Sequence, residues 1–122
     1  MDVSYPVKIW RKKWRHGSKK THSLLANKAK NDLKEIAKYL KKEASKDIAS
    51  KQSKNIKYYA NLLGANPLLG FKEPLLESEP EGFRSLIHEY YKIVYYVEND
   101  SVYIARIFDC RQNPDKLKHA IR

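Results

Sequence analysis

The sequence has 122 residues, of which 42% are hydrophobic and 32% are charged, and its formal net charge is +11. This length suits one compact domain, and no run approaches the roughly 20 apolar residues that a membrane-spanning helix needs, so we expect no membrane partner. The low cysteine content fits a reducing cytoplasm, which is the expected location. The single cysteine, Cys110, excludes an internal disulfide and a cysteine-rich zinc site.

Residues 1–20 are predicted to be a basic N-terminal extension, followed by a single domain over residues 21–122. The extension has a net charge of +6 and the rest of the chain +5, so the domain is basic by itself. Trp10 and Trp14 could stack on nucleic-acid bases or pack onto the domain. The basic surplus indicates a polyanion or an acidic protein as partner, with solubility alone as the alternative.

Residues 21–25 are expected to form a short strand, and two helices should follow it. Asn27 is a candidate N-cap for a helix that fades over residues 43–46 and places apolar residues at helical spacing opposite a lysine-rich face. The second helix should start near Asp47 and end at Gly64. The short connection between them predicts an antiparallel helical hairpin.

The second half of the sequence is predicted to contain the strands. Residues 66–70 have the composition of a turn, and strands are expected over residues 73–77, 83–88, 90–97 and 102–108, with a short C-terminal helix over residues 115–121. The order β-α-α-β-β-β-α predicts an α+β fold. Its N-terminal strand is followed by the helical hairpin, which packs on an antiparallel sheet of three to four strands.

A tight turn at Asn99 and Asp100 should place Val97 opposite Val102. Strict alternation then predicts a more apolar face that meets the helices, formed by Tyr91, Ile93, Tyr95, Val97, Val102, Ile104, Arg106 and Phe108. The other face is expected to be open, cationic and aromatic, formed by Tyr90, Lys92, Val94, Tyr96, Tyr103, Ala105, Ile107 and Asp109. Lys92 could instead only lie along a solvated sheet face.

Arg106 is predicted to have a structural role, because on the apolar face it requires a carboxylate such as Asp32 or Glu35. The histidines His16, His22, His88 and His119 are scattered, so the sequence predicts neither a metal site nor a cofactor. Cys110 has no neighbouring histidine and is interpreted as a packing residue.

Several segments together resemble the RelE/ParE superfamily, the toxins of type II toxin–antitoxin modules. The segment 29–40 (AKNDLKEIAKYL) resembles the first helix of that superfamily, and the turn 66–70 resembles the loop after its helical hairpin. The segments 83–86, 91–95 and 102–114 resemble its C-terminal half. The resemblance covers about residues 21–118 and implies a small basic toxin that an acidic antitoxin neutralises.

The two branches of the superfamily imply different mechanisms. RelE-like members cut messenger RNA on the ribosome with a cluster of Lys and Arg and usually a C-terminal Tyr, which matches the need for cations where phosphate charge builds up. ParE-like members lack the full cluster and are associated with poisoning of DNA gyrase. In this sequence Lys92 stands where the RelE-like branch has an arginine, no tyrosine follows Arg111, and the ending Arg111-Gln112-Asn113-Pro114 is more similar to ParE.

The leading interpretation is therefore a ParE-like toxin that acts by binding, with DNA gyrase as a possible target. The residues expected to bind the target are Arg84, His88, Lys92 and Arg111. The alternative is a RelE-like endoribonuclease that acts on mRNA at the ribosome, for which the catalytic candidates are Lys92, Arg111 and Arg84. A second alternative is an inactive relative or a nucleic-acid-binding module.

Overall fold

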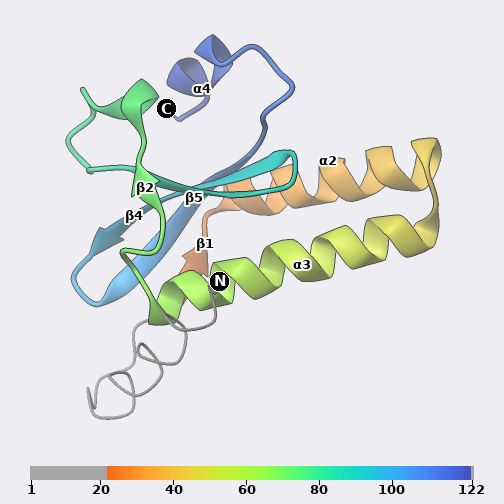
Figure 1. Ribbon diagram of the computed structural model, residues 1–122, viewed down its shortest axis with the longest axis horizontal. Coiled ribbons are helices and arrows are strands. Elements are labelled where there is room, and N and C mark those ends of the chain that lie inside the picture. Colours follow the sequence, from red (N-terminus) through yellow and green to blue (C-terminus); the bar gives the residue numbers. More distant parts are fainter. Residues whose placement is uncertain (1–21, 122) are drawn as a thin grey trace.

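The computed structural model describes residues 22–121 of the chain, so the expected N-terminal extension, residues 1–20, lies outside the described residues. Its elements follow the α+β order expected from the sequence (Figure 1). They are β1 (His22–Leu25), α2 (Asn27–Glu43), α3 (Lys46–Ala65), β2 (Phe71–Lys72), the 3₁₀ segment η1 (Pro74–Leu76), β3 (Arg84–His88), β4 (Tyr91–Glu98), β5 (Ser101–Asp109) and α4 (Asp115–Ala120).

The strands form one sheet in the order β1-β5-β4-β3-β2. The pairs β2–β3, β3–β4 and β4–β5 are antiparallel, whereas β1 pairs with β5 in the parallel direction. The expected antiparallel sheet of three to four strands is confirmed by β2 to β5, and the N-terminal strand β1 joins it in the parallel direction to give a mixed sheet of five strands. Strand β1 lies at one edge of the sheet with β5 as its neighbour, and the chain passes through the helical hairpin and the other strands before it reaches β5.

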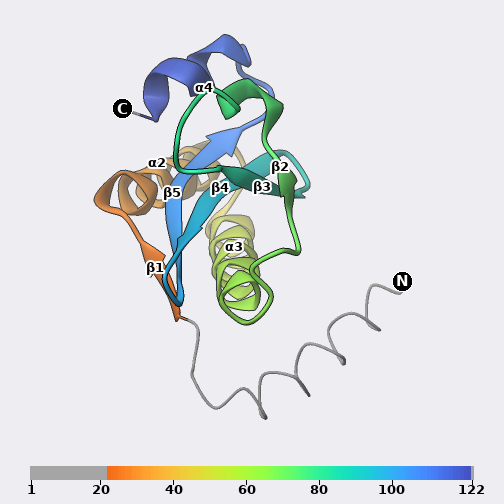
Figure 2. The ribbon, with the colours of Figure 1, turned by 90° about the vertical axis from the view of Figure 1, so that its left-hand side faces the viewer.

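The predicted antiparallel helical hairpin is confirmed, and Figures 1 and 2 show α2 and α3 lying along each other. The helix starts differ from the expected ones. Asn27 is the first residue of α2 and does not cap it, whereas the Ser45 side chain accepts a hydrogen bond from the Ile48 amide and caps α3. Helix α3 continues past Gly64 to Ala65. Among residues 22–121, no helix has the length and apolar character needed to cross a membrane.

The expected strand over residues 73–77 is wrong, because this segment is the short helix η1 and only Phe71 and Lys72 pair with β3. The Glu73 carboxylate accepts a hydrogen bond from the Leu75 amide and so starts η1, with Pro74 at its first position. The segment then leaves the plane of the sheet and covers one of its faces.

The turn between β4 and β5 has the expected register, with Val97 opposite Val102 and Asn99 at a φ of 57°. Further along, the register shifts: Tyr95 lies opposite Ile104 but Val94 lies opposite Arg106. Ala105 is thus the extra residue of a β-bulge, which reverses the alternation of β5 beyond it. The expected faces of Ile107 and Phe108 are therefore exchanged.

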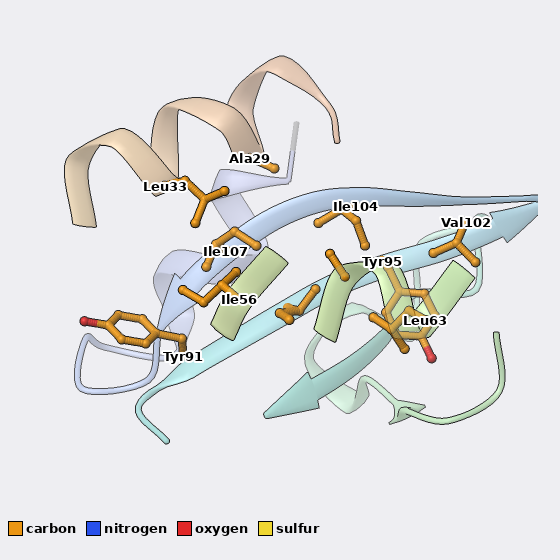
Figure 3. Packing of buried hydrophobic residues seen from close by; sticks show 11 residues of the cluster. Ala29, Leu33, Ile56, Leu63, Tyr91, Tyr95, Val102, Ile104 and Ile107 are labelled. Carbon is orange, nitrogen blue, oxygen red and sulfur yellow. The ribbon is translucent and has the colours of Figure 1, made fainter. Parts of the chain in front are cut away.

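Two apolar cores cover the two faces of the sheet. The hairpin core contains Ala29 and Leu33 of α2, Ile56 and Leu63 of α3, and sheet residues that include Ile107; Figure 3 shows these side chains converging between helices and strands. The second core is formed on the opposite face by Leu76, Phe83, Val94, Phe108 and Leu117. The expectation that this face is open is wrong, because η1 and α4 bury it.

Arg106 forms an ion pair with Asp32 of α2, one of the two carboxylates that the sequence offers it. Its Nε and Nη2 atoms donate to the two carboxylate oxygens of Asp32 at 2.8 Å each, and Nη1 donates to the Ala120 carbonyl at 2.7 Å. The same carboxylate accepts a hydrogen bond from the Ile107 amide at 2.9 Å. The hydrogen bonds that Arg106 donates to Asp32 raise the pKa of Arg106, and these contacts join α2, β5 and α4.

We predict that Arg106→Ala lowers the free energy of unfolding by about 2 kcal/mol, because both partners are largely buried and the Asp32 carboxylate loses its charge partner. Urea denaturation at pH 7 measures this loss. Glu35→Ala is the matched control, since Glu35 is exposed, and its effect should stay within about 0.5 kcal/mol. Equal stability of wild type and Arg106→Ala would contradict the structural role of Arg106.

Candidate target-binding site

Arg84 lies at the start of β3 and holds the turn that follows α3. Its Nη2 atom donates to the Gly70 carbonyl at 2.6 Å and to the Leu68 carbonyl at 3.3 Å. The Tyr95 hydroxyl holds the same turn, because it accepts from the Gly70 amide at 2.9 Å and donates to the Pro67 carbonyl at 2.8 Å. A Cβ at Gly70 would collide with the Ser85 carbonyl oxygen, so this close approach requires glycine.

His88 lies at the other end of β3, on the hairpin side of the sheet. Its ring packs against the ring of Tyr59 in α3 with 4.8 Å between centroids. Its Nε2 atom is 3.8 Å from the Glu89 carboxylate, which is too long for a hydrogen bond, and Glu89 also accepts a 2.6 Å hydrogen bond from Gln52 Nε2. The side chain of His88 is only 16% exposed, so it presents little surface to a partner.

Lys92 lies on the opposite face of the sheet from Arg84 and His88, under η1. Its ammonium group is 2.8 Å from Glu73 Oε1, and the Ser85 hydroxyl donates to the same oxygen at 2.7 Å. Burial by itself raises the pKa of the Glu73 carboxyl, but hydrogen bonds from Lys92, Ser85 and the Leu75 amide outweigh it, and the pKa is lowered. Lys92 therefore stabilises a buried carboxylate in a place that the sequence predicted to be open.

Arg111 is the most exposed of the four predicted target-binding cations, and it lies just after β5. Its guanidinium is 4.7 Å from the centroid of the Tyr90 ring and bonds both Asp109 oxygens, at 2.9 and 2.8 Å. The hydrogen bonds from Arg111 lower the pKa of Asp109. Tyr90 is itself 55% exposed, so a charged planar group and an aromatic ring lie together at the surface.

Tyr39 and Tyr91 extend this group. Burial raises the pKa of the Tyr91 hydroxyl, and the nearby Arg111 opposes that rise, while Tyr39 of α2 is close enough to interact with both. Tyr39 is 54% exposed and was missed as a site residue. An aromatic residue among the lysines of an amphipathic helix was the signal that could have identified it. We call Tyr39, Tyr90, Asp109 and Arg111 the β5-end cluster.

The structure does not bring the four predicted target-binding cations together. Arg84 and His88 occupy opposite ends of β3 on one face, Lys92 lies on the other face, and Arg111 lies beyond the sheet. The Tyr91 phenol keeps its proton at neutral pH because its pKa is raised above 10.0. Within residues 22–121, no group of His, Cys, Asp and Glu side chains could hold a metal ion. Of these four predicted residues, Arg111 therefore offers a partner an exposed cation beside aromatic rings, and the four do not converge on one point.

The sequence of residues 24–114 matches the family described as ParE toxin of type II toxin–antitoxin system, parDE. The chain belongs to the ParE toxin family. Among solved structures it is similar to a chain of the chromosomal ParDE TA system from P. aeruginosa, with 25% sequence identity and a TM-score of 0.61. The similarity covers 73% of this chain and 96% of that one. A search of curated proteins finds no match.

The match extends from within β1 to the residue before α4, so it contains the helical hairpin and most of the sheet of this ParE toxin. It also contains the β5-end cluster. The resemblance to the RelE/ParE superfamily, and to its ParE branch, is thereby confirmed.

We predict that Glu73→Gln lowers the free energy of unfolding of this ParE toxin at pH 7 by about 3 kcal/mol, since it leaves the Lys92 ammonium largely buried without a carboxylate. The double variant Glu73→Gln with Lys92→Met should recover most of the loss, because an apolar side chain of similar length suits that face. Urea denaturation of the three proteins measures both effects.

The same pair predicts a pH dependence. The folded-state pKa of Glu73 lies below its ordinary value of 4.5, so the carboxylate stabilises the fold fully above that pH and ceases to do so as the pH falls through the folded-state pKa. Between pH 5 and pH 2, stability should therefore fall more steeply in the wild type than in Glu73→Gln. Parallel pH profiles of the two proteins would contradict this role of Glu73.

Proposed function

We propose that this chain is the toxin of a type II toxin–antitoxin pair, that it acts in the cytoplasm by binding a cellular target, and that an acidic antitoxin neutralises it. The family match over residues 24–114 and the similarity to a ParDE system support the toxin assignment. The net charge of +11 supports an acidic partner.

Action by binding, and not by bond cleavage, is supported by the dispersal of the candidate cations. Phosphodiester cleavage needs several cations aimed at one phosphate and a group that takes a proton from the nucleophile. Here Arg84 bonds backbone carbonyls, Lys92 bonds Glu73, and Arg111 points to a third location. This dispersal is the observation that carries the proposal, and DNA gyrase is the target we propose.

The β5-end cluster is the surface that we propose contacts the target. Arg and Tyr are the residue types that most often dominate binding energy at protein interfaces, because each combines a large planar surface with hydrogen-bonding groups. Arg111 is already oriented by Asp109 and Tyr90, so little side-chain entropy is lost when a carboxylate or a carbonyl group of the target binds it.

We expect the purified toxin to inhibit supercoiling by DNA gyrase and to leave mRNA intact in the presence of ribosomes. Both reactions should be run on the same preparation, with heat-denatured toxin as the control. Cleavage of mRNA together with unaffected gyrase would contradict the proposal and favour the ribonuclease alternative.

Arg111→Ala should raise the toxin level that is required to inhibit growth of cells at least tenfold. The melting temperature should change by less than about 2 °C. The ion pair of Arg111 is solvent-exposed and contributes little to stability. Lys72→Ala is the control for loss of one exposed positive charge. Full toxicity of Arg111→Ala would contradict the assignment of the β5-end cluster.

A further inference from the structure

The outer side of the helical hairpin carries a row of lysines on each helix. Helices α2 and α3 contain ten lysines and four acidic residues. Six of these lysines share one side of the hairpin, and we call them the lysine face: Lys30, Lys34, Lys38 and Lys41 of α2 with Lys46 and Lys57 of α3. All six are exposed, and within residues 22–121 none forms an ion pair with a carboxylate.

Helical spacing places the α2 lysines in one row. Positions 30, 34, 38 and 41 follow the i, i+4, i+8, i+11 pattern of a single stripe, which is about 16 Å long at 1.5 Å per residue. The acidic residues of α2 follow another stripe, positions 32, 35 and 43, with Tyr39 between them. The bond between Asp32 and Arg106 fixes that second stripe toward β5 and α4.

The α3 row is oriented by its contacts with the sheet. Gln52 bonds Glu89 and Tyr59 packs on His88, so these two residues face the β3–β4 turn. Lys46 and Lys57 lie about 140° around the helix from them. Ser50 and Ser53 belong to the same stripe, because they lie four and seven positions after Lys46. Figure 1 shows α2 and α3 as an antiparallel pair. By sequence position Lys46 therefore comes near the C-terminal end of the α2 row and Lys57 near its start, so the two rows run along each other.

We propose that the lysine face binds the phosphate backbone of duplex DNA. The two rows present point charges and small polar side chains, without the apolar or aromatic anchors that dominate protein interfaces or that stack on single-stranded bases. Lysines that contact phosphates need no apolar or aromatic anchors, because release of counterions drives the binding. A row about 16 Å long spans about five base-pair steps of 3.4 Å, and helix axes 8–10 Å apart allow the rows to reach separate phosphates.

The choice of DNA rests on the proposed function, since a protein that binds gyrase works next to duplex DNA. The lysine face lies on the hairpin, whereas the β5-end cluster includes Arg111 after β5 and Asp109 at its last residue. DNA contact by the face is thus compatible with target contact by the cluster. The binding assay below contains neither gyrase nor antitoxin, so its failure is distinguishable from failure of the proposed function.

The test measures binding of the full chain to a fluorescently labelled 20-base-pair DNA duplex by anisotropy, from 50 to 200 mM NaCl. The variant Lys30→Gln, Lys34→Gln, Lys38→Gln removes three charges with little change in helix propensity. Circular dichroism verifies that it folds. We expect the slope of log K against log salt to become shallower by about 2 to 3, at about 0.9 per phosphate contact, and affinity at the lowest salt to fall at least tenfold.

The matched control is Lys72→Gln, Lys116→Gln, Lys118→Gln, which removes three exposed lysines elsewhere and gives the same net charge. Its slope should change by less than about 1. Equal losses in both triple variants, or an unchanged slope in the lysine-face variant, would overturn the proposal. Tighter binding of the wild type to a 20-nucleotide single strand or to duplex RNA than to duplex DNA would overturn the choice of ligand.

Discussion

Hydrogen bonds to the Asp32 carboxylate hold α2 against β5, and the arrangement of the main elements depends on them. This carboxylate accepts hydrogen bonds from the Arg106 guanidinium and from the Ile107 amide, just beyond the point where β1 stops covering the edge of β5. Because Arg106 also donates to the Ala120 carbonyl, α2, β5 and α4 are tied at one position. The bulge at Ala105 makes this possible, since it turns Ile107 toward the hairpin core and Phe108 toward the second core. A strand without the bulge would place these two residues on the wrong faces.

The elements with strong local signals could be predicted from the sequence. The two amphipathic helices, the turn at Asn99 and the three long strands have periodicity or turn chemistry that is readable in a short window. The bulge could not be predicted, because Ala105 has no glycine-like or turn-like signal and the shift depends on how both cores pack. The face that carries Lys92 was misjudged for the same reason: its cover comes from Leu76, Phe83 and Leu117, which are distant in sequence and individually unremarkable. The prediction of a strand over residues 73–77 was wrong because Glu73 and Pro74 favour the start of a helix over pairing with a neighbouring strand.

The cations of the strand region have different roles that charge counting could not separate. Arg84 and Lys92 each complete a network that a buried or half-buried polar group requires, namely the turn carbonyls at Leu68 and Gly70 and the Glu73 carboxylate. Arg111 is held by its neighbours but stays at the surface. In a basic protein, a cation on a strand therefore identifies a surface for partners only after its carboxylate and carbonyl partners are known. Sequence spacing reveals the cation but not those partners, which come from Glu73 and the turn after α3.

The parallel pairing of β1 with β5 has a consequence for the order of folding. Residues 22–25 lie beside residues 101–104, so this edge of the sheet joins parts of the chain separated by most of its described length. During synthesis the helical hairpin leaves the ribosome well before β4 and β5, and its apolar stripe then has no sheet to pack against. Contacts of such high sequence separation form slowly. We therefore expect the nascent chain to stay sensitive to protease until β5 has emerged, which places the onset of any activity after β5 has paired with β1. Protease digestion of ribosome-bound chains in which β5 lies either inside or outside the exit tunnel measures this directly.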